Sequence, residues 1–455
     1  MKIFTKNVGS NYLAKIVRLP KPEKIEGADK ILKVSIDNQT IIVGNKAVEG
    51  TTYIFFPLET CLNRSFLSYT NCFDKPELND DGKTKGFFRE SARVRAVRLR
   101  GLPSEGYLAP ISQLLDWLNL PPSEELEFEV GKEFDSIERQ GYESVLLCEK
   151  YMPPMKHVRS QSKAIKKDKT KRFDRMIPGQ FHFHVDTLNL KRNIHLIQPD
   201  NIITISEKLH GTSAIFSNIL VKRVLTWREK IARFFGCKIQ ETQYDYVYSS
   251  RAVIKNKYLY EEDKKLNHWY KKDIWEEAGK KITLALEPGI SIYCEIVGQM
   301  PGGGWIQKNY DYGTNPKEHE VYVYRITSTD PNGNVREFTT NQIKAYCNKY
   351  NLKTVPIHYY GKALEYTWVL DPTLINSNPT EQIGWFYKNF LDLVSKEHLE
   401  KPCSMCKNKV PAEGIVITVE KDQFTAFKLK SWNFLEQETR NLDIGVIDTE
   451  LEESL

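Results

Sequence analysis

The stretch ISEKLHGTSAIF, residues 205–216, places Lys208 next to a glycine turn between two apolar runs. Two apolar runs joined at a glycine are typical of two strands connected by a turn. A lysine at such a turn is either an exposed surface charge or a nucleophile. A nucleophilic lysine must be neutral, which costs roughly 4–5 kcal/mol at pH 7 from an ordinary pKa of ~10.4. Other cations near Lys208 are therefore needed for the second interpretation.

The composition indicates a globular protein with more than one domain. A chain of 455 residues exceeds the size at which single cores stop growing, and its 40% hydrophobic and 27% charged residues are ordinary for globular domains. The N-terminal stretch has no continuous apolar segment, and no long uncharged apolar window occurs anywhere, so we expect no membrane segment and a cytoplasmic location. The eight scattered cysteines fit reduced thiols, and the CxxC of Cys403 and Cys406 lacks the second pair that a structural zinc site needs.

Charge is concentrated in two short segments. Residues 156–175 contain nine Lys or Arg and two Asp, a segment charge of +7, whereas the whole chain has a net charge of +6. The last twenty residues contain seven Asp or Glu and one Arg, so the C-terminal tail is acidic. We interpret residues 151–180 as a basic linker. Concentrated positive charge also binds phosphate backbones through counterion release.

The first 150 residues consist of short apolar runs separated by Gly, Asn, Asp and Pro, a pattern that predicts a β-rich barrel or sandwich. One of these runs, ARVRAVRLRG, carries four alternating or near-alternating arginines. They form either a nucleic-acid surface or an edge strand protected by charge. The candidate nucleic-acid-binding residues are Arg93, Arg95, Arg98 and Arg100.

Residues 181–455 mix strand-like runs with helical periodicity at 340–352 and 385–399, which predicts an α+β domain with mostly antiparallel strands. In the second helix, Phe386, Phe390, Leu393 and Val394 share one stripe. Residues 221–236 form a basic amphipathic insertion, which we interpret as a surface helix rather than a second phosphate contact.

Several short motifs follow Lys208 in a fixed order. They contain Arg251 in SSRAV, Glu295 in YCEIVG, Tyr322 and Tyr324 in VYVYRI, Glu413 in EGIVI, and Lys428 and Lys430 in FKLKS. The ordered set resembles motifs I, Ia, III, IIIa, IV and V of the covalent nucleotidyltransferases, the superfamily of ATP-dependent DNA and RNA ligases and mRNA-capping guanylyltransferases. Six matches in order over residues 206–431 are far more specific than any one of them.

The residue types suit that chemistry. Lys428, Lys430 and a divalent metal would disfavour the protonated form of Lys208 and stabilise charge on an attacked phosphate. Glu295 and Glu413 lie in strand-like runs and offer the oxygen ligands that magnesium or a ribose hydroxyl accepts.

The resemblance implies a role for each motif residue. Lys208 would become lysyl-AMP, Glu413 would organise Mg²⁺ (or Mn²⁺), and Tyr324 would stack on adenine. The sequence departs from the family pattern at His210 and Arg325, where many members carry Asp, and the second departure leaves the choice between Tyr322 and Tyr324 open. The residues that would bind ATP are Glu207, Arg251, Glu295, Tyr324, Lys428 and Lys430.

The order of domains favours one branch of the superfamily. Only 24 residues follow Ser431, too few for the OB domain that capping enzymes and most DNA ligases place there. Residues 1–150 resemble instead the OB-like module that some RNA ligases carry in front of the catalytic domain, which would occupy residues 181–455. The resemblance implies an ATP-dependent RNA ligase that acts in RNA repair, on RNA or on a nicked duplex containing RNA. A DNA ligase, a capping guanylyltransferase and a non-catalytic RNA-binding protein are the alternatives, and the oligomeric state is left open.

Overall fold

The chain forms two compact units. We describe it from a computed structural model that covers residues 2–7, 11–121, 128–138, 143–153, 175–251, 253–255, 273–368 and 372–445. The first unit contains Met1–Pro153, Asn189–Arg192 and Leu435–Ile444, and the second contains Pro154–Leu188, Asn193–Phe434 and Gly445–Leu455. Most of the basic segment at 156–175 and the end of the acidic tail lie outside the described residues.

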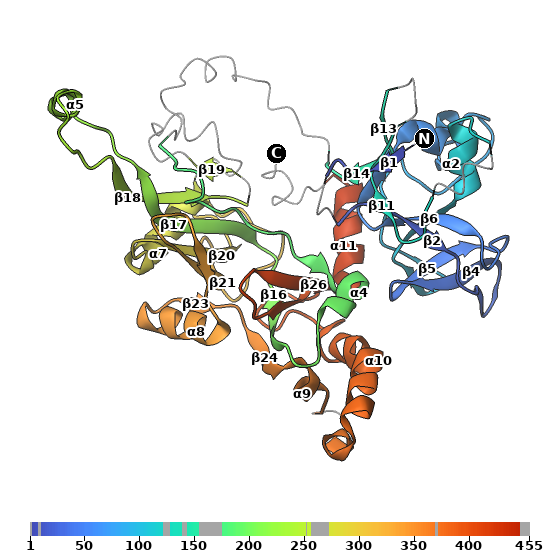
Figure 1. The fold of residues 1–455 in the computed structure, drawn as a ribbon. Helices are drawn as coiled ribbons and strands as arrows, with labels where there is room; N and C mark the ends of the chain where they lie inside the picture. Colours follow the sequence, from blue (N-terminus) through green and yellow to red (C-terminus); the bar gives the residue numbers. More distant parts are fainter. Residues whose placement is uncertain are drawn as a thin grey trace. The chain divides into compact units, whose positions relative to one another are not determined.

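The first unit is built mainly from short strands (Figure 1). Its elements in the first 153 residues are β1 (Lys2–Phe4), β2 (Ala14–Arg18), β3 (Glu23–Ile25), β4 (Ala28–Ile36), β5 (Gln39–Gly44), β6 (Thr52–Pro57), β7 (Thr60–Leu62), α1 (Arg64–Tyr69), η1 (Pro76–Leu78), β8 (Val97–Leu99), β9 (Leu102–Ser104), β10 (Gly106–Pro110), α2 (Ile111–Trp117), β11 (Glu133–Phe134), β12 (Ser136–Glu138), β13 (Val145–Leu146) and β14 (Cys148–Lys150).

A four-stranded antiparallel sheet, in the order β10-β6-β2-β11, forms the centre of this unit. All six residues of β6 are buried, because both faces of the sheet are covered. Ile54 and Phe56 pack with Phe66 of α1 in one core, whereas Tyr53 and Phe55 pack against β4 and β5 in another. Burial on both faces explains why this strand is a continuous apolar run rather than an alternating one.

The expected barrel is not confirmed in the first unit. Among the described residues its strands form five separate sheets, with the orders β1-β12-β13, β10-β6-β2-β11, β14-β7, β3-β4-β5 and β8-β9, and none of these closes on itself. The run ARVRAVRLRG also differs from expectation, since its paired strand is limited to Val97–Leu99. Residues Leu435–Ile444, which comprise most of helix α11 (Trp432–Asp443) and the residue after it, belong to this unit, although the sequence placed them in the C-terminal domain.

The second unit has the expected mixture of helices and mostly antiparallel strands. From residue 188 on, the elements are β15 (Leu188–Asn189), α4 (Leu190–Asn193), η4 (Ile194–Leu196), β16 (Ile202–Lys208), β17 (Thr212–Lys222), α5 (Trp227–Phe234), β18 (Thr242–Ser249), β19 (Ile254–Lys255), α7 (Ile274–Ile282), η5 (Thr283–Ala285), β20 (Ile290–Gly298), β21 (His319–Thr329), β22 (Val335–Glu337), α8 (Thr340–Lys349), β23 (Lys353–Thr354), β24 (Ile357–Lys362), α9 (Ala363–Trp368), η6 (Pro372–Asn376), α10 (Pro379–His398), β25 (Gly414–Val419), β26 (Thr425–Lys430) and then α11.

Two sheets organise the second unit. The first has the order β15-β26-β25-β16-β24, and the second has the order β19-β18-β17-β20-β21-β22, with β23 paired in parallel to β21. One face of the second sheet packs against α7 and α8 (Figure 1), through residues such as Ala214, Cys294 and Val323. Because strand side chains alternate, the opposite face carries Ser213 and Glu295, which are directly paired across β17 and β20.

The helices expected in this unit are confirmed. The segment 340–352 gives α8, and 385–399 gives the longer α10, in which Phe386, Phe390 and Val394 are buried as the stripe predicted. The basic insertion is the surface helix α5, which lies at the far end of the β17–β18 hairpin (Figure 1).

Candidate active site

Three adjacent strands bring Lys208, Glu413 and Lys430 together. Lys208 ends β16 opposite Gly414 of β25, and Gly414 lies opposite Lys430 of β26. The carboxylate of Glu413, just before β25, lies 2.8 Å from Lys208 Nζ and 3.7 Å from Lys430 Nζ. Its side chain is only 4% exposed, so two cations share one buried carboxylate.

The backbone fixes Glu413 in this position. Gly414 has φ +140°, and a Cβ there would lie 2.1 Å from the carbonyl oxygen of Leu429. Only glycine fits, which explains why glycine follows the glutamate in EGIVI. The backbone N–H of Ser431, just after β26, donates to the carbonyl oxygen of Glu413 at 2.8 Å, so the backbone of Glu413 is fixed as well.

The loop after Lys208 is held against the second sheet. The backbone N–H of Gly211 donates to Oε1 of Glu295 at 3.0 Å, and that of His210 donates to the hydroxyl of Tyr312 at 2.6 Å. A Cβ on Gly211 would lie 2.3 Å from the carbonyl oxygen of Ile296, so a larger residue would push the loop away from β20. Glu295 therefore orients the loop that carries Lys208.

His210 takes a place that many family members give to Asp. Its ring packs edge-on against Tyr310 and Phe434, with ring centroids 4.8 and 4.9 Å away. Its Nδ1 lies 3.8 Å from Oε2 of Glu413. The loop thus presents an imidazole, not a second carboxylate, to the site.

Lys428 adds a third lysine to the same face of the sheet as Lys430. Burial, and then the positive charges of Lys430, Lys208 and Arg251, lower its pKa to about 8, against the opposing effect of Asp186. Asp186 itself forms an ion pair with Arg251. Burial raises the pKa of Asp186, but Arg251 outweighs that effect and keeps the pKa below its usual value.

Tyr322 and Tyr324 share the face that carries Glu295, but their surroundings differ. Tyr322 is 9% exposed and packs in a cluster with Leu209 and Phe434. Tyr324 is half-buried, and its hydroxyl lies 3.2 Å from the hydroxyl of Ser213 and 3.2 Å from Nδ1 of His184. Burial raises the pKa of Tyr324, so its hydroxyl stays protonated.

Arg325, where many family members carry Asp, has structural partners. Its guanidinium lies 4.3 Å from the ring centroids of both Tyr293 and Phe424, and its Nε donates to Oε2 of Glu337 at 2.9 Å. The side chain of Arg325 is buried. Because its guanidinium is paired with Glu337, an arginine at this position leaves no uncompensated buried charge.

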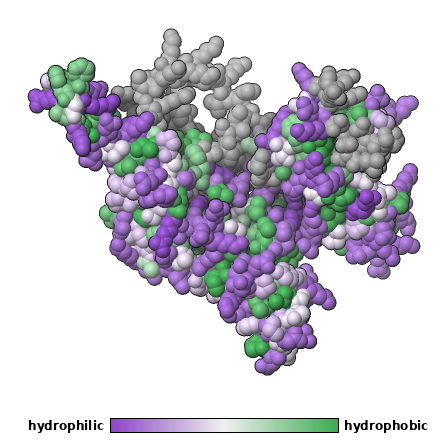
Figure 2. Space-filling model, viewed as in Figure 1, coloured by the Kyte–Doolittle hydropathy of each residue, from purple (hydrophilic) through white to green (hydrophobic). Residues whose placement is uncertain are grey.

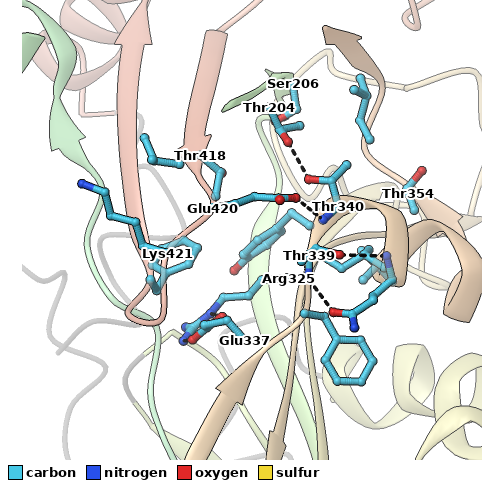
Figure 3. A pocket seen from close by; sticks show the side chains of 18 of the residues that line it. Thr204, Ser206, Arg325, Glu337, Thr339, Thr340, Thr354, Thr418, Glu420 and Lys421 are labelled. Atoms are coloured by element: carbon cyan, nitrogen blue, oxygen red, sulfur yellow. Dashed lines mark hydrogen bonds and ion pairs between the residues drawn. The ribbon is translucent and has the colours of Figure 1, made fainter. Parts of the chain in front are cut away.

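A cavity of about 540 Å³ lies between the two sheets (Figure 3). Thr204 and Ser206 line it, and they share the face of β16 that carries Lys208 two residues further on. Tyr324 lines it from β21. Figure 3 shows Thr204 bonded to Thr340, whose backbone N–H donates to Glu420 at 3.0 Å. The cavity is large enough for a small ligand, and its lining includes Tyr324 but not Lys208, Glu413 or Lys430.

Among the predicted ATP-binding residues, Glu207 differs because its side chain faces away from Lys208. By strand alternation its side chain lies on the opposite face from Lys208, and its Oε2 is 3.9 Å from Nε2 of His358. Burial raises the pKa of Glu207.

Three residues that contact Arg251 or Tyr324 were not among the site residues predicted from the sequence: Asp186, His184 and Ser213. The alternating polar residues of FHFHVD, residues 181–186, were the available signal, although their partners lie more than 60 residues away.

The four arginines of ARVRAVRLRG are placed differently from the expectation of an open nucleic-acid surface. The side chain of Arg93 is 1% exposed and lies 3.2 Å from Asp443 of α11, and Arg95 is 3.3 Å from the same carboxylate. Arg98 pairs with Glu436 at 3.2 Å, and Arg100 is exposed. Arg93 and Arg95 therefore hold α11 in the first unit.

Two further properties bear on ligands. In the described part of the chain, no three His, Cys, Asp or Glu side chains gather into a group that could hold a metal ion by themselves. No helix there combines the length and the apolar character needed to cross a membrane.

Comparison with known proteins identifies the family. The model of the RNA ligase family matches residues 201–432, more than half of the chain. Solved structures of an RNA ligase from Naegleria gruberi are similar in fold: a mutant with AMP and Mn has 16% identity and a TM-score of 0.55 over 93% of this chain and 98% of that chain. A second mutant, with ATP and Mn, has 15% identity and a TM-score of 0.55 over 97% and 100% of the two chains. No curated protein matches. By its family match, with the motif residues gathered in the matched region, the chain belongs to the RNA ligase family.

Proposed function

We infer that the protein is an ATP-dependent RNA ligase in which Lys208 carries AMP. The observation behind this inference is the convergence of Lys208, Glu413 and Lys430 beside a cavity lined by Tyr324. The match to the RNA ligase family and the similar fold of a ligase solved with ATP and Mn support it.

In the first step, the neutral amine of Lys208 attacks the α-phosphate of ATP, a P–N bond forms, and pyrophosphate leaves. Lys428 and Lys430 lie on the same face of the sheet and would stabilise charge on the phosphate oxygens. Without nucleotide, Nζ of Lys208 is held in an ion pair with Glu413 at 2.8 Å. The amine must therefore leave this ion pair before it can attack.

The site fits one divalent cation, Mg²⁺ or Mn²⁺. Oε2 of Glu413 is buried and accepts no hydrogen bond from the described residues, so it offers an oxygen ligand. Magnesium is commonly held by one or two carboxylates together with substrate phosphates, so a single protein carboxylate suffices. When bound, the cation would neutralise the carboxylate that pairs with Lys208 and polarise the phosphate.

The nucleoside would lie in the cavity. Tyr324 presents an aromatic ring to it and would stack on adenine. Arg251 and Glu295 would contact the ribose, and Glu207 would reach the nucleotide only if its side chain turned from the opposite face.

In the second and third steps, AMP passes from Lys208 to a 5′-phosphate end, and a 3′-hydroxyl displaces it to form the phosphodiester. We propose that the substrate is a nick in a duplex containing RNA and that the role is RNA repair. Residues 1–150 would act as an OB-like nucleic-acid-binding module, residues 151–180 as a basic linker, and residues 181–455 as the catalytic domain. In the module, the exposed Arg100 would contact phosphates.

A set of nicked duplexes tests this function. The duplexes differ only in ribose or deoxyribose at the 3′-hydroxyl strand, and sealing is followed on a denaturing gel with ATP or GTP. We expect sealing with ATP and a preference for the ribose end. Sealing of DNA ends at the same rate would indicate a DNA ligase, and labelling by GTP alone would indicate a capping enzyme. RNA binding without covalent labelling would indicate a non-catalytic protein.

A further inference from the structure

The β17–β18 hairpin carries a folded projection, residues 223–241, which we call the finger. Its helix α5 begins after Thr226, and the two residues Thr226 and Glu229 form a capping box. The Thr226 hydroxyl accepts a hydrogen bond from the backbone N–H of Glu229, and the Glu229 carboxylate accepts one from the backbone N–H of Thr226. Arg223 pairs with Glu229, and Arg233 lies 3.1 Å from Glu241. The finger therefore has its own capped helix and two ion pairs, although no side chain of α5 is buried.

The finger exposes large aromatic side chains. Phe234 is 85% exposed, Phe235 is 76% exposed and Trp227 is 67% exposed. Trp227, Ile231 and Phe234 are spaced as i, i+4 and i+7, which places them on one stripe of α5. Figure 2 shows hydrophobic side chains beside hydrophilic ones on this projection. A helix that leaves such a stripe in water is typical of an interaction surface.

The charge of the finger narrows the class of partner. Residues 223–241 hold five Lys or Arg and two Glu, which gives +3. Arg228, Lys230 and Lys238 are exposed, and Arg228 lies 5.4 Å from the ring of Trp227. A second copy of the finger would bring +3 against +3, which is unfavourable. Aromatic rings interleaved with cations match the bases and phosphates of a nucleic acid.

We propose that the finger binds single-stranded RNA that flanks the junction to be sealed, an inference that rests on the proposed ligase function. Unpaired bases stack on Trp227, Phe234 and Phe235. The flanking phosphates contact Arg228, Lys230 and Lys238. Single strands are required because bases in a duplex are already stacked and the major groove of A-form RNA is too narrow for side chains.

The length of the β17–β18 hairpin sets the distance between the finger and the loop that carries Lys208. Strand β17 runs for 11 residues from Thr212, next to the loop of Lys208, to Lys222 at the base of the finger. At ~3.3 Å per residue it spans roughly 35 Å, or about ten nucleotides at ~3.4 Å each. Substrates with a shorter single-stranded flank should not reach the finger.

The test is a comparison of RNA affinities by fluorescence anisotropy. The full chain and its Trp227→Ala and Phe234→Ala variants are titrated with a junction bearing a flank of about twenty unpaired nucleotides and with a blunt duplex. We expect each variant to lose between about fivefold and a hundredfold in affinity for the flanked RNA, because stacking contributes that much per base, and to bind the blunt duplex normally. The control Leu284→Ala, at a 90% exposed apolar side chain outside the finger, should behave as wild type.

The charges give a second, independent readout. Combining Arg228→Gln, Lys230→Gln and Lys238→Gln should lower the slope of log affinity against log salt by about 2, since each phosphate contact to a single strand contributes about 0.7. Unchanged affinity and slope would overturn the proposal, as would equal losses on flanked and blunt RNA. Loss of binding to phosphatidylserine vesicles with unchanged RNA affinity would assign the finger to a membrane surface instead.

Two controls keep the result interpretable. If Trp227→Ala lowers the Tm, Phe234→Ser combined with Phe235→Ser replaces it, because both side chains are exposed. AMP loading of Lys208 needs no RNA, so it should be unchanged in every finger variant. A wild type that never loads AMP would refute the ligase function, whereas RNA affinities would still decide the role of the finger.

Discussion

Lys428 should make nucleotide binding depend on pH. Burial and the nearby charges of Lys430, Lys208 and Arg251 lower its pKa to about 8. Below that pH its ammonium is present and would bind the α-phosphate, and above it the neutral amine offers no charge. At pH 9 only about one molecule in eleven would retain the charge, so affinity should fall about tenfold, with a further tenfold loss per additional pH unit.

The assay is the Kd of an ATP analogue whose α,β-bridging oxygen is replaced by methylene, measured by calorimetry between roughly pH 7 and pH 10. The analogue binds but cannot transfer AMP to Lys208, so the affinity is separated from the reactivity of the nucleophile. Affinity should be constant at the lower end and bend downward near the pKa of Lys428 in the free protein. In Lys428→Arg the bend should disappear, since arginine stays charged throughout this range.

A substitution at the neighbouring Lys430 tests the direction of this effect. Lys430 lowers the pKa of Lys428, so Lys430→Gln should weaken binding at every pH and also move the bend to higher pH. A wild-type affinity that does not fall with rising pH would contradict the role of Lys428, as would the same fall in Lys428→Arg.

Three further variants probe the architecture. Asp443→Ala leaves the buried Arg93 without its carboxylate and should lower the free energy of unfolding by about 3–5 kcal/mol, measured as a lower Tm. The control Glu436→Ala removes a more exposed ion pair and should cost at most about 1 kcal/mol. Equal decreases in Tm would contradict this prediction. Gly211→Ala places a Cβ 2.3 Å from a backbone oxygen and should slow AMP loading about a hundredfold with unchanged circular dichroism; a normal rate would show that the loop tolerates movement. Glu413→Gln should raise the Mg²⁺ concentration for half-maximal loading at least about tenfold, and an unchanged requirement would place the metal elsewhere.

Much of the candidate site could be predicted from the sequence because its residues sit in short motifs at strand ends. The motifs around Lys208, Glu413 and Lys430 each contain a strand, and antiparallel pairing aligns these strands so that the charged residues meet. The pairing partners were not readable from the sequence, but their order along the chain matched a known family. The motif residue Tyr324 also lines the cavity, and its stacking on adenine stays a prediction.

Long-range pairing limited the remaining predictions. Arg93 sits in an alternating pattern that suited an exposed strand, yet its partner Asp443 is 350 positions away. Nothing local to ARVRAVRLRG shows that a helix from the far end of the chain covers it. The barrel expected in the first unit depends in the same way on which distant strands pair, and the spacing of apolar runs does not determine that.

The covalent intermediate tests the central claim most directly. The protein is incubated with ATP and Mg²⁺, digested, and analysed by mass spectrometry for peptides that carry AMP. We predict a single AMP on the peptide containing Lys208, none in Lys208→Ala, and normal labelling in the control Lys362→Ala, which alters an exposed lysine on β24. AMP on any other lysine, or labelling that persists in Lys208→Ala, would contradict the assignment of Lys208 as the nucleophile.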